Sequence, residues 1–321
     1  MLGVMNHNEK VLVRNAAIVI GVSFLLSRVM LGNFLFTIPL MVLAPKFSDR
    51  RKALLPVGAV AVLMIAFELV QARSALSDPA GRLLLLIGMF IPVVLLIGSA
   101  IWIYLDDQRT LIRYLASTSF GVVASMLLVV MLSRGSETVL RVDAAMLETF
   151  QLMFQQLEGS AEASVDLQKL YRMSVLVSGS MLVPTIMGLI GFASFMAMSY
   201  NARLDGTFSD RIARWKAPEI NLWVFLGAWT VVLLMMILKA SYIVRALALN
   251  IALGSSVLFA VQGIAIVLYI VRRKGLAIST GRLLSTIFFI AMVVPGLNVL
   301  VVFVLPLLGV TETWIVYRKN E

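Results

Sequence analysis

Residues 83–105 read LLLLIGMFIPVVLLIGSAIWIYL and contain no charged side chain. A helix rises about 1.5 Å per residue, so this stretch would be about 35 Å long as a helix. That length is enough to cross a hydrocarbon core of about 30 Å. Comparable apolar stretches recur along the chain, and the sequence therefore predicts an all-α, polytopic bundle of transmembrane helices.

We expect about eight to ten membrane segments, with the count open at two places. The segment 33–45 is short and contains Pro39, so it fits a re-entrant or tilted segment as well as a full crossing. Pro295 and Gly296 fit either a tight turn between two short helices or a kink in one long helix. The candidate segments span residues 15–30, 33–45, 54–72, 83–105, 112–132, 173–198, 221–238, 244–271, 282–294 and 298–316.

The composition supports a membrane protein and fixes an expected orientation. Hydrophobic residues make up 60% of the chain and charged residues 14%, whereas soluble domains carry about 25% charged residues. The net charge is +10, but the basic residues lie in short loops between apolar stretches, so we expect lipid rather than nucleic acid as the partner. If the N-terminus is cytoplasmic, the basic clusters at 46–52, 211–216, 272–275 and 317–319 all fall inside. The positive-inside rule therefore predicts that both termini are cytoplasmic.

The order of apolar and polar stretches predicts three parts. A six-segment membrane part covers residues 1–198, a cytoplasmic basic loop covers 199–220, and a C-terminal membrane part covers 221–321. Within the first part, an apolar stripe predicts an amphipathic helix at about 137–158 on the outer side. That helix either packs over the bundle, lies along the membrane boundary or forms a mobile lid over an outward-facing cavity. The stripe consists of Val139, Val142, Met146, Phe150, Met153 and Leu157.

Several classes of chemistry are excluded by missing residues. The chain has no cysteine and its one histidine is His7, which excludes thiolate metal sites, multi-histidine metal sites and a Ser-His-Asp triad. The sequence also lacks a GxxxxGK[ST] phosphate loop, an HExxH motif and a GxSxG elbow. We therefore expect a protein that is not an enzyme and that holds no metal or cofactor.

Ionisable groups within membrane segments are the first candidates for function, because they are costly there. Arg28 lies near the outer end of the first segment and Glu68 near the outer end of the third, so the two reach a similar depth. They either form a structural ion pair, extend to the headgroups, or face an outer cavity and contact a polar ligand.

Two polar positions in the C-terminal part also need partners. Gln262 lies in the apolar stretch 244–271, where an amide must bond another helix or line a polar cavity. Small residues recur every four positions in the same stretch and predict close helix packing; they are Ala248, Ala252, Ser256 and Ala260. Glu312 lies near the end of the last segment, close to the expected cytoplasmic boundary.

The C-terminal third resembles the YybS-like family, bacterial integral membrane proteins grouped as a domain of unknown function. The resemblance rests on VQGIAIVLYIVRRKG at 261–275, the proline break, and GVTETWIVYRKN at 309–320. WKAPEINLW at 215–223 is similar to the family's approach to a membrane helix. An Asp usually precedes the tryptophan in the family, and here that position is Glu312. The matching positions are Gln262, Gly263, Pro295, Gly309, Glu312, Trp314 and Arg318.

The N-terminal part of that family is similar to the S-components of energy-coupling factor transporters. S-components bind vitamins or similar solutes from the outer side and dock on a separate membrane coupling protein. The resemblance implies a small-solute site at Arg28, Asn33 and Glu68, a membrane partner subunit, and a place in the bacterial cytoplasmic (inner) membrane. The alternative hypothesis is a membrane scaffold that recruits envelope or cytoplasmic partners through its basic cytoplasmic loops.

Overall fold

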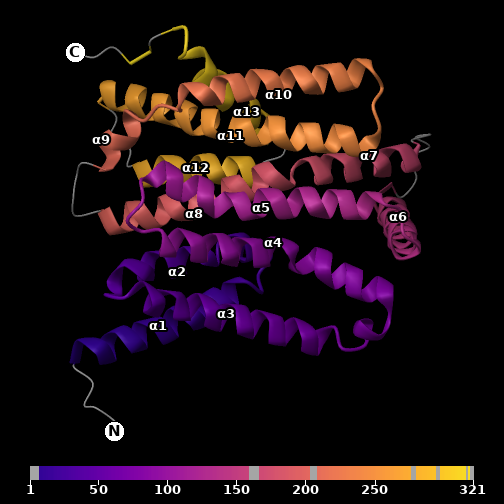
Figure 1. Cartoon of the computed structure of the whole chain (residues 1–321), viewed down its shortest axis with the longest axis horizontal. Helices are drawn as coiled ribbons and strands as arrows, with labels where there is room; N and C mark the ends of the chain where they lie inside the picture. Colours follow the sequence, from indigo (N-terminus) through magenta and orange to yellow (C-terminus); the bar gives the residue numbers. More distant parts are fainter. Residues whose placement is uncertain are drawn as a thin grey trace.

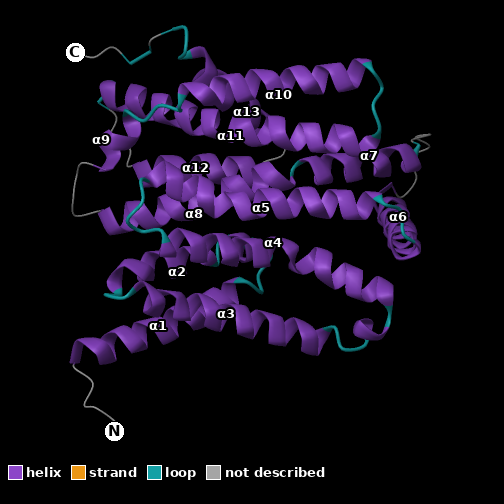
Figure 2. Cartoon of the chain, viewed as in Figure 1, coloured by secondary structure: helices purple, strands orange, loops and turns teal. Residues whose placement is uncertain are grey.

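Every regular element in the described part of the chain is helical, which confirms the predicted all-α fold (Figure 2). The structure is a computed structural model that describes residues 7–158, 166–202, 208–275, 280–293, 297–315 and 317–318. The α-helices are α1 (His7–Leu26), α2 (Thr37–Leu43), α3 (Arg50–Gln71), α4 (Pro79–Tyr104), α5 (Thr110–Ser133), α6 (Glu137–Glu158), α7 (Leu167–Ser180), α8 (Leu182–Asn201), α9 (Phe208–Ala213), α10 (Glu219–Ile237), α11 (Tyr242–Arg273), α12 (Thr280–Val293) and α13 (Leu297–Thr311). Short 3-10 turns lie at Gly32–Phe34 (η1), Ala44–Lys46 (η2) and Ala75–Ser77 (η3).

The long helices lie side by side, with α1 and α3 at one edge of the bundle and α10 at the opposite edge (Figure 1). Within the described residues, six helices are long and apolar enough to cross a bilayer: α3, α4, α5, α8, α10 and α11. Shorter apolar helices occupy 37–46, 280–290 and 301–311. This is a multi-pass membrane protein.

The larger of the two clusters of buried apolar side chains surrounds α2, α4 and α8. Phe36 and Leu40 come from the α2 region, Leu95 from α4, and Ile186 and Ile190 from α8, and all are at most 2% exposed. Because lipid tails are as apolar as these side chains, close van der Waals packing rather than the hydrophobic effect holds such helices together. A second cluster joins α10 to α11 through Val232, Ala248 and Ala252, as the small-residue stripe of α11 predicts.

The sixth predicted segment, 173–198, is two helices rather than one. Helix α7 ends at Ser180 and α8 begins at Leu182. Pro184 explains the interruption, because its ring nitrogen cannot donate the helical hydrogen bond to the carbonyl of Ser180. The predicted segment 173–198 is therefore interrupted at Met181.

Two other boundaries bear on the open helix count. Helix α2 has 7 residues and is about 10 Å long, so it is too short to cross alone. The structure therefore favours the re-entrant or tilted alternative for residues 33–45. Pro295 and Gly296 lie outside the described residues. Helix α13 ends at Thr311, before the end of the predicted segment 298–316.

The basic clusters gather at one end of the bundle. The ends of α4, α8 and α11 and the starts of α3, α5, α10 and α12 lie together at that end (Figure 1). The α3–α4 and α10–α11 connections and α6 lie at the opposite end. We refer to the two as the basic end and the outer end, following the orientation that the sequence predicts.

The predicted amphipathic helix is confirmed as α6, which lies across the outer end of the bundle (Figure 1). Val142 is buried, and Tyr171 of α7 donates a hydrogen bond of 2.8 Å to Asp143 Oδ1. Met146 and Met153 are 43% and 59% exposed, so only part of the apolar stripe packs against the bundle. In this structure α6 is packed against its neighbours.

Candidate functional site

Arg28 and Glu68 meet at the outer end of the bundle. The Arg28 Nη1 lies 2.6 Å from Glu68 Oε1, and the two side chains are 22% and 28% exposed. Arg28 lies two residues beyond the end of α1, and Glu68 lies in the last turn of α3. The sequence argument that placed both at one depth is thus confirmed, and the two form an ion pair.

Two aromatic rings hold the Arg28 guanidinium in place. Its carbon lies 4.2 Å from the centroid of the Phe67 ring and 5.2 Å from that of Phe24. The rings meet edge to face at 5.8 Å. Each cation–π contact contributes about 0.5–1 kcal/mol at an exposed site and more where water is excluded. The guanidinium is therefore held in one orientation by its neighbours.

A tight turn brings Asn33 to the same end of α1. A Cβ on Gly32 would lie 2.3 Å from the carbonyl oxygen of Leu26, so only glycine allows the chain to fold back this closely. The backbone N–H of Asn33 then donates a hydrogen bond of 2.8 Å to the carbonyl of Val29. The turn that carries Arg28 therefore also carries Asn33.

Unpartnered polar atoms concentrate in this region. Within the described part of the chain, four buried side-chain atoms have no hydrogen-bond partner: Ser23 Oγ, Arg28 Nε, Arg28 Nη2 and Asn33 Oδ1. All belong to residues 23–33. Buried polar groups are almost always hydrogen-bonded, so these four atoms have hydrogen-bonding capacity that no described group of the chain uses. The two guanidinium donors need an acceptor, and the amide oxygen needs a donor.

A second polar cluster joins the C-terminal motif residues Gln262, Glu312 and Arg318. Arg318 donates from Nε to Glu312 Oε1 over 2.6 Å and from Nη2 to Glu312 Oε2. Gln262 Nε2 donates to the same Oε2 over 2.9 Å. The Glu312 and Arg318 side chains are 1% and 6% exposed, so the pair is buried and neutral as a unit.

This cluster also fixes the backbone between α9 and α10. Arg318 Nη1 donates to the carbonyls of Ala213 and Trp215, over 2.6 and 3.0 Å. The N–H of Ala217 donates to Gln262 Oε1 over 2.8 Å. A buried charge pair is tolerated only where such hydrogen bonds satisfy its remaining donors and acceptors. We call Gln262, Glu312 and Arg318 the C-terminal clasp.

Two glycines allow α11 and α13 to approach closely beside the clasp. A Cβ on Gly263 would lie 2.1 Å from the carbonyl oxygen of Leu305, and one on Gly309 would lie 2.1 Å from that of Phe259. Leu305 lies one helical turn before Gly309 in α13, and Phe259 lies one turn before Gly263 in α11. Each glycine therefore packs against the backbone next to the other glycine. No larger residue fits either position without separating the two helices.

The structure brings together most of the residues that the sequence singled out. Gln262, Gly263, Gly309, Glu312 and Arg318 converge at the clasp, while Trp314 is 65% exposed and takes no part in it. Pro295 lies outside the described residues. Arg28, Asn33 and Glu68 lie together at the outer end. The structure therefore separates the sequence candidates into two groups.

Asn250 is a further key polar residue that the sequence argument missed. It lies in α11, is 1% exposed, and bridges the break between α7 and α8. Its Oδ1 accepts from the N–H of Val183 over 3.0 Å, and its Nδ2 donates to the carbonyl of Gly179 over 2.7 Å. The available signal was a single asparagine in the apolar stretch LALNIALG.

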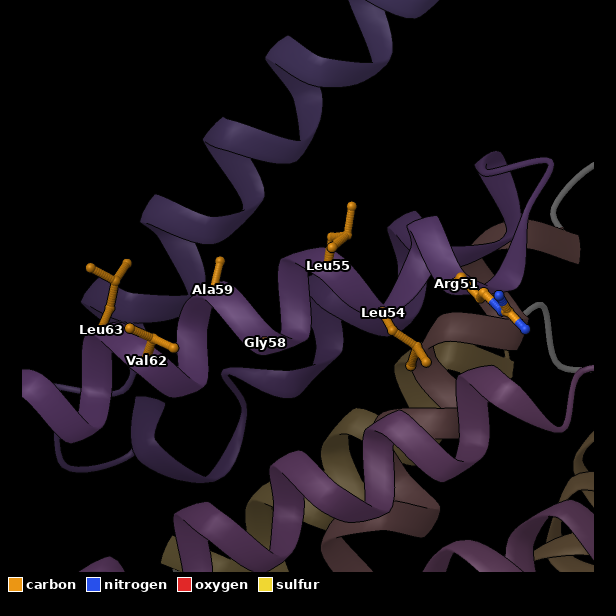
Figure 3. Close-up of a pocket in the computed structure, with 7 residues that line it drawn as sticks. All are labelled: Arg51, Leu54, Leu55, Gly58, Ala59, Val62 and Leu63. Carbon is orange, nitrogen blue, oxygen red and sulfur yellow. The ribbon is translucent and has the colours of Figure 1, made fainter.

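Two grooves open on the bundle surface away from the outer ion pair. The first, of about 600 Å³, follows one face of α3 from Arg51 to Leu63 and is almost entirely apolar (Figure 3). The second, of about 880 Å³, lies between α2, α8 and α12. Neither groove is lined by Arg28, Asn33 or Glu68.

Comparison with known proteins adds no relative to this picture. No protein-family model, curated protein or solved structure matches the chain.

Proposed function

We propose that this multi-pass membrane protein binds a small polar solute at its outer end, through Arg28, Asn33 and Glu68, without acting on it chemically. The observation that carries the proposal is the concentration of unpartnered polar atoms in residues 23–33. Leaving a buried donor or acceptor unpaired costs about 1–3 kcal/mol, more for a charged group. A bound solute that satisfies these atoms recovers that free energy.

The chemistry of the site defines the class of solute. Arg28 Nε and Nη2 form one edge of the guanidinium, and such an edge binds a carboxylate through two parallel hydrogen bonds. Glu68 already neutralises the charge of Arg28, so a solute that brings its own cation is favoured over a bare anion. Asn33 Oδ1 accepts a hydrogen bond from that cation. The solute is therefore a small zwitterion with a carboxylate and an ammonium or similar donor.

Access to the site requires a local movement. The unpartnered Arg28 atoms are covered, with Phe24 and Phe67 against the guanidinium. Residues Val29, Met30 and Leu31 of the adjoining turn are 50–87% exposed, so they have little packing to lose on moving. We propose that this turn opens to admit the solute and closes over it.

A partner must supply energy if the solute is carried across the membrane. The chain has no phosphate loop of its own, so it does not couple ATP hydrolysis to transport by that means. We propose a separate membrane subunit in that role, as in the S-component systems that the N-terminal part resembles.

Thermal unfolding of the purified full chain in mild detergent tests the solute site. The probes are free amino acids, and monocarboxylates without an ammonium group. A binding amino acid at one hundred times its Kd stabilises the folded chain by about 2.7 kcal/mol, and the matched monocarboxylate by less. Arg28→Gln should abolish the stabilisation.

The matched control is Arg141→Gln, which removes an arginine from an exposed ion pair at the same end. It should leave the response to amino acids unchanged. Equal stabilisation of the wild type and Arg28→Gln, or no stabilisation of the wild type by any probe, would contradict the proposal.

A specific observation also favours the scaffold as a second candidate function. The clasp holds the basic backbone segment between α9 and α10 through Ala213, Trp215 and Ala217, so that segment has one defined shape. A defined basic surface suits recruitment of an acidic partner. A crosslinking group placed at position 214, where Arg214 is exposed beside the clasp, should then capture one discrete protein in cells. Capture of no protein would count against this function.

A further inference from the structure

The groove between α2, α8 and α12 is built along a regular helix seam. Three pairs of residues face each other across α8 and α12, one pair per turn. Phe192 stacks on Phe288 with ring centroids 3.8 Å apart, and Ser285 Oγ lies 4.0 Å from Met196 Sδ. At the third pair, a Cβ on Gly281 would lie 3.7 Å from Ser199 Oγ. The seam fixes one wall of the groove, and α2 supplies the other through Ile38 and Val42.

The lining of the groove changes from apolar to polar along its length. Leu35, Ile38 and Phe192 line its apolar part. The last turn of α8 contributes Ser199 and Tyr200, and the first turns of α12 contribute Arg282, Ser285 and Thr286. Those turns lie at the basic end of the bundle (Figure 1). The apolar part therefore faces the bilayer interior, and the polar part lies at the level of the cytoplasmic headgroups.

The charge of the lining is complementary to an anion. Arg282 is exposed, and hydroxyl-bearing residues of both α8 and α12 line the same groove. None of the described residues that line the groove is acidic. Arginine and hydroxyl donors are the groups that bind phosphate oxygens, and basic pockets between membrane helices on the cytoplasmic side bind lipid headgroups. The volume of about 880 Å³ is within the range of ligand-binding clefts.

We infer that this groove binds an anionic phospholipid of the cytoplasmic leaflet. The phosphate lies against Arg282 and the hydroxyls of Ser199 and Thr286, and one acyl chain follows the apolar wall toward Phe192. The inference is independent of the outer solute site, because the two sites share no residue and lie at opposite ends of the bundle.

Lipid retention by the full chain tests the inference. The protein is reconstituted in vesicles of phosphatidylcholine and phosphatidylglycerol with identical acyl chains, extracted in mild detergent, and assayed for bound lipid by native mass spectrometry. The wild type should retain phosphatidylglycerol in preference to phosphatidylcholine. Arg282→Gln should weaken that preference about fivefold, the factor equivalent to about 1 kcal/mol for one basic residue.

A second variant addresses the acyl-chain part of the groove. Ser285→Trp places a large ring in the space beside Met196 and should abolish retention of both lipids. Arg282 and Ser285 are exposed, so both variants are expected to keep the helical content of the wild type.

Two controls separate this site from general charge effects. Arg109→Gln removes an exposed arginine at the same end but outside the groove, and Arg28→Gln alters only the outer site; both should retain phosphatidylglycerol as the wild type does. Equal loss in Arg109→Gln and Arg282→Gln would overturn the inference. Displacement of the lipid by millimolar inorganic phosphate would also overturn it, because the site would then recognise phosphate alone.

Discussion

Arg318 and Glu312 form a buried ion pair just beyond the last residue of α13, with Arg318 Nε 2.6 Å from Glu312 Oε1. The pair is joined to α11 through Gln262 and to the segment before α10 through Ala213 and Trp215. Elements separated by about a hundred residues in the chain therefore share one closed network. The C-terminal clasp therefore fixes the backbone between α9 and α10.

Removing the carboxylate of the clasp should destabilise the protein strongly. Glu312→Gln leaves the Arg318 charge buried without its counter-ion, which costs about 3–5 kcal/mol. The double variant Glu312→Met with Arg318→Met should recover part of this loss, since no unpaired charge remains. Unfolding in mild detergent measures the change, and a loss below about 1 kcal/mol for Glu312→Gln would contradict the buried pair. The exposed pair Arg141–Glu137 is the control, and Arg141→Gln should cost at most about 1 kcal/mol.

The close contact of α11 and α13 predicts a sharp difference between two glycines. Gly263→Ala places a methyl group against the carbonyl of Leu305 and should destabilise the protein by about 1–3 kcal/mol. Gly227→Ala in α10 meets no atom within 4 Å and should be neutral or stabilising by up to about 1 kcal/mol. Thermal unfolding of the two variants side by side checks the difference. Equal midpoints would mean that the helices are not in backbone contact at Gly263.

The predicted orientation can be read by cysteine labelling, because the chain contains no cysteine of its own. Lys274→Cys lies at the basic end and Ser77→Cys at the outer end, and both positions are exposed. A membrane-impermeant maleimide should label Ser77→Cys in intact cells and should label Lys274→Cys only after permeabilisation. The reverse pattern would invert the topology and place the basic clusters outside.

The contact between α6 and α7 should depend on pH through Tyr171. Burial, followed by the hydrogen bond to Asp143, raises the pKa of the Tyr171 hydroxyl from about 10 to about 12. Because the folded protein favours the protonated hydroxyl, the stabilisation is complete below about pH 10 and is lost as the pH rises through about 12. The difference in tyrosinate absorbance between the wild type and Tyr171→Phe should have a midpoint near 12. A midpoint near 10 would show that Tyr171 is not held against α6.

The helices themselves could be predicted from the sequence, but most of their polar contacts could not. Bilayer-length apolar stretches and the stripe of α6 are local patterns, so α4 and α6 lie close to their predicted ranges. The Arg28–Glu68 pair could also be predicted from the sequence, because both residues lie near the outer ends of their helices. Depth in the membrane can be estimated from the sequence without knowing the three-dimensional packing.

Contacts that depend on packing between helices far apart in the chain could not be predicted from the sequence in this way. Asn250 accepts a hydrogen bond from the N–H of Val183 at the break between α7 and α8, although it lies 67 residues after Val183 in the chain. Gln262 and Glu312 are 50 residues apart and meet only because two glycines let α11 and α13 touch. The sequence showed that Gln262 needs a partner, but it did not identify that partner.

Native mass spectrometry of the full chain, extracted from its own membranes in mild detergent, tests the central claim most directly. The account predicts one small zwitterionic molecule per chain on the wild type, lost from Arg28→Gln and retained by Arg282→Gln. A wild type without such a molecule, or one that Arg28→Gln retains equally, would contradict a solute site at Arg28, Asn33 and Glu68.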